Sequence, residues 1–242
     1  MATNIQARLA AERRFYSSMA LFMIAVVVIG FAPSFYLRGI VHSPRPNPSL
    51  PPAIMFHGVM FSLWMIIFWA QTALVAAGQR TTHMRLGVAG MIFAALLVPV
   101  MYMTAIGQVV RANQPPFATP LGWTIVPLAP IPVYVALVAL GWYHRRNAQA
   151  HKRLMLGASL LMMDPAIGLL PIVPPMLGGF AFLGLLSWLT FAPLFWWDFR
   201  TLGKLHWATR LGAGLFGGAL ILRLLLIPNQ GWAAIAAHLP GV

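Results

Sequence analysis

The chain has 242 residues, of which 60% are hydrophobic and only 8% charged, and its mean hydropathy is +0.79. A soluble domain carries about 25% charged residues, so this composition excludes an ordinary soluble protein and indicates an integral membrane protein. The absence of cysteine excludes disulfides, thiolate metal sites, iron–sulfur clusters and covalently attached c-type haem.

Long apolar stretches predict an all-α, polytopic membrane bundle of about seven transmembrane helices. A crossing needs about 20 predominantly apolar residues, and the predicted helices are 16–37, 53–77, 86–107, 122–143, 154–173, 176–197 and 207–228. We therefore expect one membrane domain over residues 1–242. It comprises a basic cytoplasmic tail (1–15), the bundle (16–228) and an external tail (229–242).

The formal net charge of +13 is explained by where the basic residues lie. Twelve of the 16 lysines and arginines fall before the first helix or in loops on the same side: Arg8, Arg13, Arg14, Arg80, Arg85, Arg145, Arg146, Lys152, Arg153, Arg200, Lys204 and Arg210. Loops rich in Lys and Arg stay in the cytoplasm. The sequence thus predicts a bacterial inner-membrane protein with a cytoplasmic N-terminus and an external C-terminus, whose partner is the lipid bilayer and not nucleic acid.

A short motif, His followed by Arg-Leu, recurs at the start of three predicted helices. It reads Thr82-His83-Met84-Arg85-Leu86-Gly87, Ala150-His151-Lys152-Arg153-Leu154-Met155 and His206-Trp207-Ala208-Thr209-Arg210-Leu211-Gly212. The histidines are 68 and 55 residues apart, and each interval fits one helical hairpin. The chain is thus interpreted as a lone helix followed by three related hairpins.

These histidines have two interpretations. Basic residues at a cytoplasmic helix start anchor the helix at lipid phosphates. Small or flexible side chains also follow on the same helical face: Gly87 and Gly90 after His83, Met155 and Ala158 after His151, and Ala213 after His206. Such a face leaves room for a close helix or for a haem b held by imidazoles from two helices. His83 and His151 are the preferred metal ligands, with His206 and His144 as substitutes.

The predicted second helix carries a polar stripe. His57, Trp64 and Gln71 are seven residues apart, so they lie on one face and span about 21 Å, and we expect this face to point away from lipid. His57 lies near the outer surface, so it cannot share an iron with the inner histidines across a core of about 30 Å. An outer haem would need His57 with another ligand, such as His42, His238, Met101 or Met103.

Asp164 is the one acidic residue expected deep in the bilayer, where insertion of a carboxylate costs about 2.5–3.5 kcal/mol. Pro165 follows it and removes a backbone hydrogen bond, which predicts a kink there. Asp164 and Gln71 are candidates for a proton or ion path, and an ion pair between Asp164 and Arg223 is one way to compensate the charge. In the predicted seventh helix, Gly214-x-x-x-Gly218 indicates close helix packing.

Motifs from the predicted second to fifth helices resemble a family of uncharacterised bacterial multi-pass membrane proteins. The motifs are Phe56-His57-Gly58, Gln71-Thr72, Gly78, His83-Met84-Arg85-Leu86-Gly87, His151-Lys152-Arg153-Leu154-Met155 and Asp164-Pro165-Ala166-Ile167. The layout is also similar to that of di-histidine cytochrome b-type membrane proteins. The first resemblance implies no particular activity, and the second implies haem ligation by helix-end histidines.

Three functions remain open from the sequence. The first is an inner-membrane b-type haem redox protein, quinone-linked or oxidase-associated, with His83, His151, His206 and His57 as candidate cofactor ligands. The second is a transporter or channel for a small solute or protons that uses Asp164, and the third is a non-catalytic subunit or assembly factor of a membrane complex. Motifs for ATP-driven pumping, retinal binding by a membrane lysine, or hydrolysis are absent from the sequence.

Overall fold

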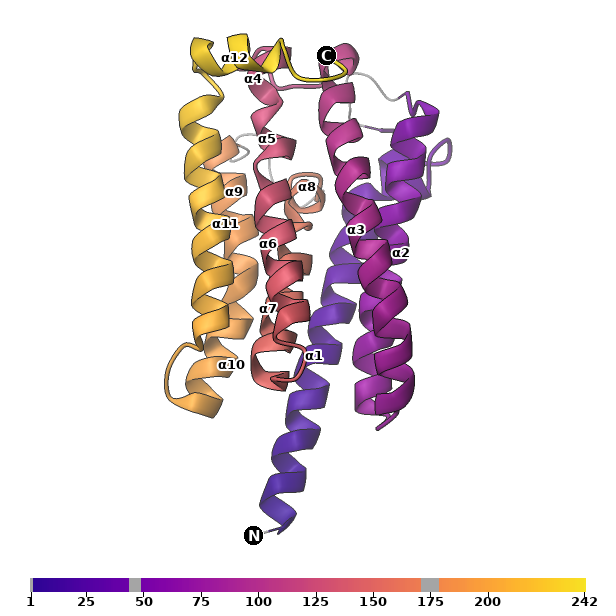
Figure 1. Cartoon of the computed structure of the whole chain (residues 1–242). Coiled ribbons are helices and arrows are strands. Elements are labelled where there is room, and N and C mark those ends of the chain that lie inside the picture. Colours follow the sequence, from indigo (N-terminus) through magenta and orange to yellow (C-terminus); the bar gives the residue numbers. More distant parts are fainter. Residues whose placement is uncertain (1, 44–48, 171–178) are drawn as a thin grey trace.

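A computed structural model of the protein describes residues 2–43, 49–170 and 179–242. Over these ranges the chain is almost entirely helical and forms no β-sheet, and the long helices run side by side as a bundle (Figure 1). The two chain ends lie at opposite ends of the bundle (Figure 1). We call the end that carries the N-terminus the basic end, because most of the arginines and lysines lie there.

The predicted class of an all-α polytopic membrane bundle is confirmed. Within the described ranges, six helical segments are long and apolar enough to cross a membrane: Ile5–Tyr36, Pro52–Ala76, Arg80–Arg111, Pro120–Tyr143, Phe180–Leu202 and Trp207–Leu226. Their side chains are apolar on most faces, as expected for helices surrounded by lipid and by one another.

The first three segments and the last are nearly unbroken helices, and the fourth and fifth are built from shorter pieces. The helices are α1 (Ala2–Phe31) with the π-helical turn η1 (Ala32–Tyr36), α2 (Pro52–Ala76), α3 (Arg80–Arg111), α4 (Pro120–Trp123), α5 (Ile125–Leu128), α6 (Pro130–Tyr143), α7 (Ala148–Leu161), α8 (Asp164–Ile167), α9 (Phe180–Trp188), the 3₁₀ turn η3 (Leu189–Phe191), α10 (Ala192–Leu202), α11 (Trp207–Leu226) and α12 (Gln230–Ala236). Pro120 starts α4, and the divisions among α4, α5 and α6 follow from Pro127 and Pro130, which donate no backbone hydrogen bond.

The ends of the chain are more helical than the sequence analysis expected. Helix α1 begins at Ala2, so most of the predicted basic tail continues the first membrane helix, whose N-terminal turns extend past the rest of the bundle (Figure 1). Residues 2–29 contain no glycine or proline, and alanine, arginine, glutamate and leucine favour helix. The predicted external tail contains α12, which packs against α4 across the other end.

The predicted helix 154–173 is interrupted. Helix α7 ends at Leu161, and the backbone amides of Met162 and Met163 turn to the carbonyls three residues earlier before α8 starts at Asp164. Pro165 fits the first turn of α8, where its missing amide proton costs nothing. This segment is therefore not among the six long spans, and residues 171–178 of the predicted fifth and sixth helices lie outside the described residues.

Helix α7 lies at the centre of the bundle. From Arg153 onward nearly all of its residues are buried, and it packs against α6 and α11. A Cβ on Gly212 would lie 3.4 Å from the Phe191 ring and 3.9 Å from the Cα of Gly157. The glycines thus allow α7 and α11 to approach closely around one phenylalanine, which is the packing role small residues have in membrane bundles.

The prediction that Gly214-x-x-x-Gly218 mediates packing is wrong within this chain. Both glycines are exposed, and a Cβ added to either would meet no other atom of the structure within 4 Å. The helix turns its buried face, which carries Gly212, Ala213 and Phe216, about a quarter turn or more away from them. Spacing alone cannot tell which of two small-residue faces points inward.

Candidate functional site

The structure brings together the two histidines that the sequence analysis preferred. His83 lies in the first turn of α3 and His151 in the first turn of α7, and their ring centroids are 6.3 Å apart with the ring planes at 82°. The two residues are 68 positions apart in sequence. Because α3 and α7 both start at the basic end, the recurrent motif places two imidazoles at the same depth.

A backbone carbonyl holds the His151 ring. Its Nδ1 lies 2.8 Å from the carbonyl oxygen of Gly141, near the end of α6. A carbonyl can only accept, so Nδ1 donates and carries the proton of the neutral ring. The lone pair is then on Nε2, and this tautomer is the usual one for a histidine that binds a metal through Nε2.

Gln71 on α2 holds the His83 ring. With its side-chain amide oriented to satisfy its neighbours, its nitrogen donates to His83 Nδ1 at 2.5 Å, and its oxygen accepts from the Gly87 amide at 2.8 Å. In this orientation Nδ1 of His83 accepts and Nε2 carries the proton. Rotating the amide by 180° would place its oxygen against Nδ1, and Nε2 would then have the lone pair that a ligand needs.

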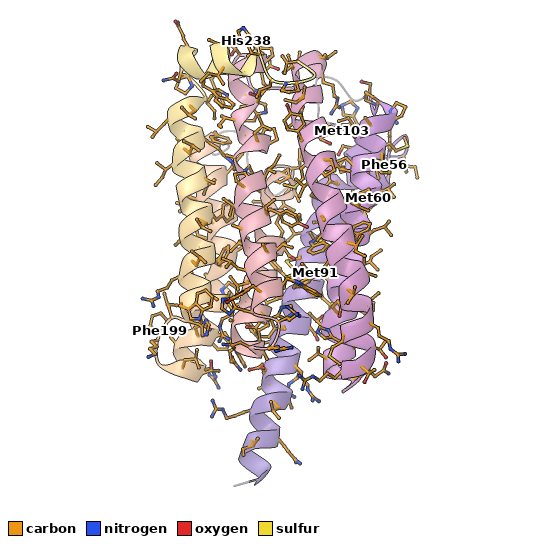
Figure 2. All side chains as sticks on the ribbon, viewed as in Figure 1. Phe56, Met60, Met91, Met103, Phe199 and His238 are labelled. Carbon is orange, nitrogen blue, oxygen red and sulfur yellow. The ribbon has the colours of Figure 1, made fainter. Side chains whose placement is uncertain are left out.

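An apolar groove lies further along α3 than the histidine pair. It has a volume of about 520 Å³ between α3 and α6, and it runs from Met91 to Pro99 on α3 and from Tyr134 to Trp142 on α6. Figure 2 shows Met91 partway along α3, beyond the level at which that helix begins. His83, Gly87 and Met91 share one face of α3 at intervals of four residues, and Trp142 follows Gly141. Eight residues of helix, about 12 Å, separate His83 from Met91, and neither histidine lines the groove.

The donor set limits which metal centre the pair could hold. Within residues 2–43, 49–170 and 179–242 there is no group of three or more His, Cys, Asp or Glu side chains placed to bind a metal. Two protein ligands do not make the four-ligand site of structural zinc or the three-ligand site of catalytic zinc. They are sufficient for a haem iron, because the macrocycle provides the other ligands.

His206 lies in a different site. Its Nδ1 accepts from the Ala208 amide at 3.1 Å, so the side chain caps the N-terminus of α11. Desolvation lowers the pKa of His206 below its usual 6.5, and the positive charge of Arg153 lowers it further, so the ring is neutral at pH 7 and can accept this bond. His144 ends α6 and contacts the ring of Trp207. Both substitutes therefore have structural contacts of their own.

The stripe of His57, Trp64 and Gln71 on α2 faces the bundle, as predicted. It runs along the helix from His57, towards the end opposite the basic end, to Gln71 beside the histidine pair. Trp64 is 2% exposed and contacts the Tyr134 ring edge-on at 6.1 Å. His57 stacks on Phe61 at 4.2 Å, and its Nδ1 is buried with no hydrogen-bond partner in the described part of the chain. His57 precedes Gln71 by about 21 Å of helix. It is therefore too far from the pair to share a ligand with it.

The other proposed outer ligands have separate environments. Nδ1 of His238 lies 2.9 Å from the carbonyl oxygen of Ala234, and His238 lies at the end opposite the basic end (Figure 2). Met103 is half exposed, whereas Met101 is buried in the core. His42 is exposed. His57 is thus the one candidate of this group that is partly enclosed by the bundle and carries a buried, unsatisfied ring nitrogen.

Arg223 compensates the charge of Asp164. Its Nη1 donates to Asp164 Oδ2 at 2.5 Å, and the side chains are 1% and 15% exposed. The pair connects the short helix α8 to α11, beyond the interruption of α7. The positive charge of Arg223 thus offsets the free-energy cost of placing the Asp164 carboxylate in the membrane. The Nε of Arg223 is buried and has no partner among the described residues.

A second buried ion pair was missed by sequence reasoning. Asp198 is fully buried and accepts four hydrogen bonds: from Arg153 Nε (2.8 Å) and Nη2 (2.6 Å), from the His206 amide (2.9 Å) and from the Thr209 hydroxyl (2.6 Å). Arg153 Nη1 also donates to Gln149. The small number of acidic residues could have indicated this pair, because a chain with three acids uses each of them for a purpose. All three are paired with a basic side chain, and the third pair is Glu12 with Lys152.

Comparison of the chain with protein-family models, with curated proteins and with solved structures finds no match.

Proposed function

We propose that the protein is a b-type haem electron-transfer protein of the bacterial inner membrane, in which His83 and His151 would hold the haem. The observation that carries this proposal is the imidazole pair from α3 and α7, with centroids 6.3 Å apart and nearly perpendicular planes. Each Nδ1 is engaged by a separate hydrogen-bonding group. Nε2 of His151 therefore has the lone pair that can bind iron, and Nε2 of His83 has it once the Gln71 amide rotates so that its oxygen faces Nδ1.

The chain's own residues would hold and tune the haem, which supplies one-electron redox chemistry. The Gly141 carbonyl orients His151, and the Gln71 amide orients His83; such partners of ligating histidines set the ring orientation and the basicity of the ligand. Gly87 leaves space on the ligand face of α3, because a Cβ there would meet only the Gln71 amide, at 3.6 Å.

The location and partners belong to the same proposal. The excess of lysine and arginine at the basic end supports a cytoplasmic N-terminus and an external C-terminus. A haem near that end would exchange electrons with a partner at the cytoplasmic side of the membrane. We therefore propose a quinone or another subunit of an oxidase-type membrane complex as the electron-transfer partner.

The test is the visible absorption spectrum of protein purified from haem-replete cells, oxidised and then reduced. We expect a Soret band and, after reduction, the sharp bands of a six-coordinate haem b. His83→Ala and His151→Ala should each abolish or strongly shift them, because each removes an axial ligand. His238→Ala is the matched control, since this histidine lies at the far end of the bundle (Figure 2).

Folding has to be measured with the same samples. Monodisperse elution in detergent and an unchanged helical circular dichroism spectrum would show that the variants are folded. A folded but colourless wild-type protein would contradict the haem proposal. So would a spectrum that is identical in the wild type and in both ligand variants.

A second candidate function, proton-coupled transport or passage of a small solute, is favoured by one observation. The α7–α8 helix is interrupted beside the buried Asp164–Arg223 pair, and interrupted helices beside ionisable groups are a feature of transporter sites. In this case the purified protein is colourless, and proteoliposomes show pH-dependent uptake that Asp164→Asn removes. A stable Asp164→Asn variant with unchanged flux would exclude a transport function that uses Asp164.

A further inference from the structure

A basic cleft lies at the basic end, between α1 and the last turn of α2, and neither histidine of the pair lines it. Its volume is about 280 Å³, and its lining residues are Ala10, Arg13, Arg14, Ser17 and Ala76. The first four lie on one side of α1 at intervals of three or four residues. They come from the region where the charged first turns of α1 meet its apolar part.

Three polar groups face this cleft. Arg13 Nη1 donates to the carbonyl oxygen of Ala76 at 3.3 Å, which fixes the guanidinium over the C-terminus of α2 and leaves its other N–H groups for a ligand. Arg14 is exposed beside it. The hydroxyl oxygen of Ser17 is buried and has no hydrogen-bond partner in the described part of the protein. The cleft thus combines two cationic donors with an unsatisfied hydroxyl.

The surface next to the cleft is apolar. From Ser17 the same side of α1 continues through Leu21 and Val28, whose side chains are 53% and 43% exposed. These residues lie in the segment Ile5–Tyr36, which is apolar enough to cross a membrane. A molecule seated in the cleft would therefore have a charged pocket at one end and an exposed hydrocarbon-like surface along α1.

We propose that this cleft binds an anionic phospholipid, with the phosphate on Arg13, Arg14 and Ser17 and an acyl chain along Leu21 and Val28. Guanidinium groups and hydroxyls are the usual donors to phosphate. Basic pockets between transmembrane helices bind the head groups of anionic lipids. The apolar surface selects a lipid over a free phosphate ion, which has no hydrocarbon to place there. The proposal does not depend on the haem.

The experiment measures lipid retained by the full-length protein. Wild type is reconstituted in nanodiscs of phosphatidylcholine with a minor fraction of phosphatidylglycerol, extracted in mild detergent, and examined by native mass spectrometry. We expect bound phosphatidylglycerol to exceed its share of the bilayer. In Arg13→Gln/Arg14→Gln the retained phosphatidylglycerol should fall about tenfold or more, because the variant removes both guanidinium groups that line the cleft, and a basic group in contact with an anionic head group is worth about a factor of five.

The matched control is Arg8→Gln/Arg146→Gln, which removes the same charge from exposed positions that do not line the cleft. It should retain wild-type lipid. Ala10→Trp, which fills the cleft without changing any charge, should lose lipid as the arginine variant does. Thermal unfolding of each variant shows whether it is folded, and Arg14→Gln alone serves if loss of the Arg13 bond to Ala76 destabilises the bundle.

Three results would overturn the proposal. Equal losses in the cleft variant and the control variant would mean that only the general surface charge matters. Equal retention of phosphatidylcholine and phosphatidylglycerol would exclude a selective anionic site. Displacement of the lipid by inorganic phosphate at millimolar concentration, without any effect of Leu21→Gln, would indicate a free-phosphate site instead.

Discussion

Candidate haem ligands lie at both ends of the bundle, but the histidines at the basic end are oriented by hydrogen bonds and, within the described part of the chain, His57 at the other end is not. At the basic end, His83 and His151 face one another across 6.3 Å, and each Nδ1 has a hydrogen-bonding partner. At the other end, His57 stacks on Phe61 and its buried Nδ1 has no partner in the described residues. A histidine near a helix end becomes a credible ligand when a neighbour orients it and a second ligand meets it.

The two buried ion pairs also differ between the ends, in how many of their hydrogen-bonding groups have partners. Near the basic end, Asp198 accepts four hydrogen bonds, and its partner Arg153 lies two residues after His151 on α7. Towards the other end, Asp164 and Arg223 share one short hydrogen bond, and Arg223 Nε is unsatisfied within the described chain. The Arg153–Asp198 pair thus holds the start of α7 with a fully hydrogen-bonded carboxylate. In the Asp164–Arg223 pair, the Nε of Arg223 still lacks an acceptor among the described residues.

The largest expected effect is loss of the saturated pair. Asp198→Ala leaves the buried Arg153 guanidinium without its anion, and removal of one partner of a buried ion pair costs about 3–5 kcal/mol. Thermal or denaturant unfolding in detergent measures this loss. The double variant Arg153→Leu/Asp198→Leu should recover part of the stability, because no buried charge is left unpaired; equal losses in the single and double variants would contradict this.

A smaller loss is expected at the other pair. Asp164→Leu should cost about 3 kcal/mol, because the pair is less saturated and Asp164 is partly exposed. Asp164→Asn should cost only about 1 kcal/mol, since the amide oxygen still accepts from Arg223. The same unfolding assay measures both. If Asp164→Leu destabilised the protein more than Asp198→Ala does, the contrast between the two pairs would be wrong.

Substitutions of Gln71 test whether its hydrogen bond to His83 distinguishes this site from that of His57. Gln71→Glu places a carboxylate against His83 Nδ1, which should make the ring a stronger ligand and lower the midpoint potential of the haem. Gln71→Leu removes the orienting group, and loss of such a partner lowers metal affinity by about 10–100-fold. Redox titration and haem content measure the two effects. Equal potentials in wild type and in Gln71→Glu would argue against His83 as a ligand.

The smallest expected effect is at His57. His57→Ala should leave the absorption spectrum and the midpoint potential unchanged, because His57 lies about 21 Å along α2 from Gln71. His57→Phe is a second variant that keeps the stacking on Phe61. Loss of the Soret band in both variants, with His83→Ala unaffected, would move the haem to the other end of the bundle.

Much of the fold was predictable because lipid imposes a simple rule on composition. Apolar length identified α1, α2, α3, α11 and the α4–α6 segment, and the recurrent motif placed His83 and His151 at one depth. The interruption at Met162 and Met163 was harder to predict. Pro165 indicated only a kink, whereas the structure has a turn that ends α7 and divides the predicted span.

The parts of the site that were missed depend on tertiary contacts. Arg153 is one of many basic residues at the predicted cytoplasmic ends of helices, and nothing in the local sequence shows that it is buried against Asp198. The roles of Gln71 and the Gly141 carbonyl also require knowing which helices touch. His206 shares the motif of His83 and His151, but it caps α11, because its backbone is extended where theirs is helical.

Electron paramagnetic resonance of the oxidised, purified protein would identify a haem held by two histidines, because low-spin haem iron with two imidazole ligands has a characteristic anisotropic signal. We expect this signal in the wild type and in His238→Ala, with about one haem per chain. The signal should be lost in His83→Ala and in His151→Ala while both variants remain folded. A folded wild type without haem iron, or a signal that persists in both ligand variants, would rule out haem ligation by His83 and His151.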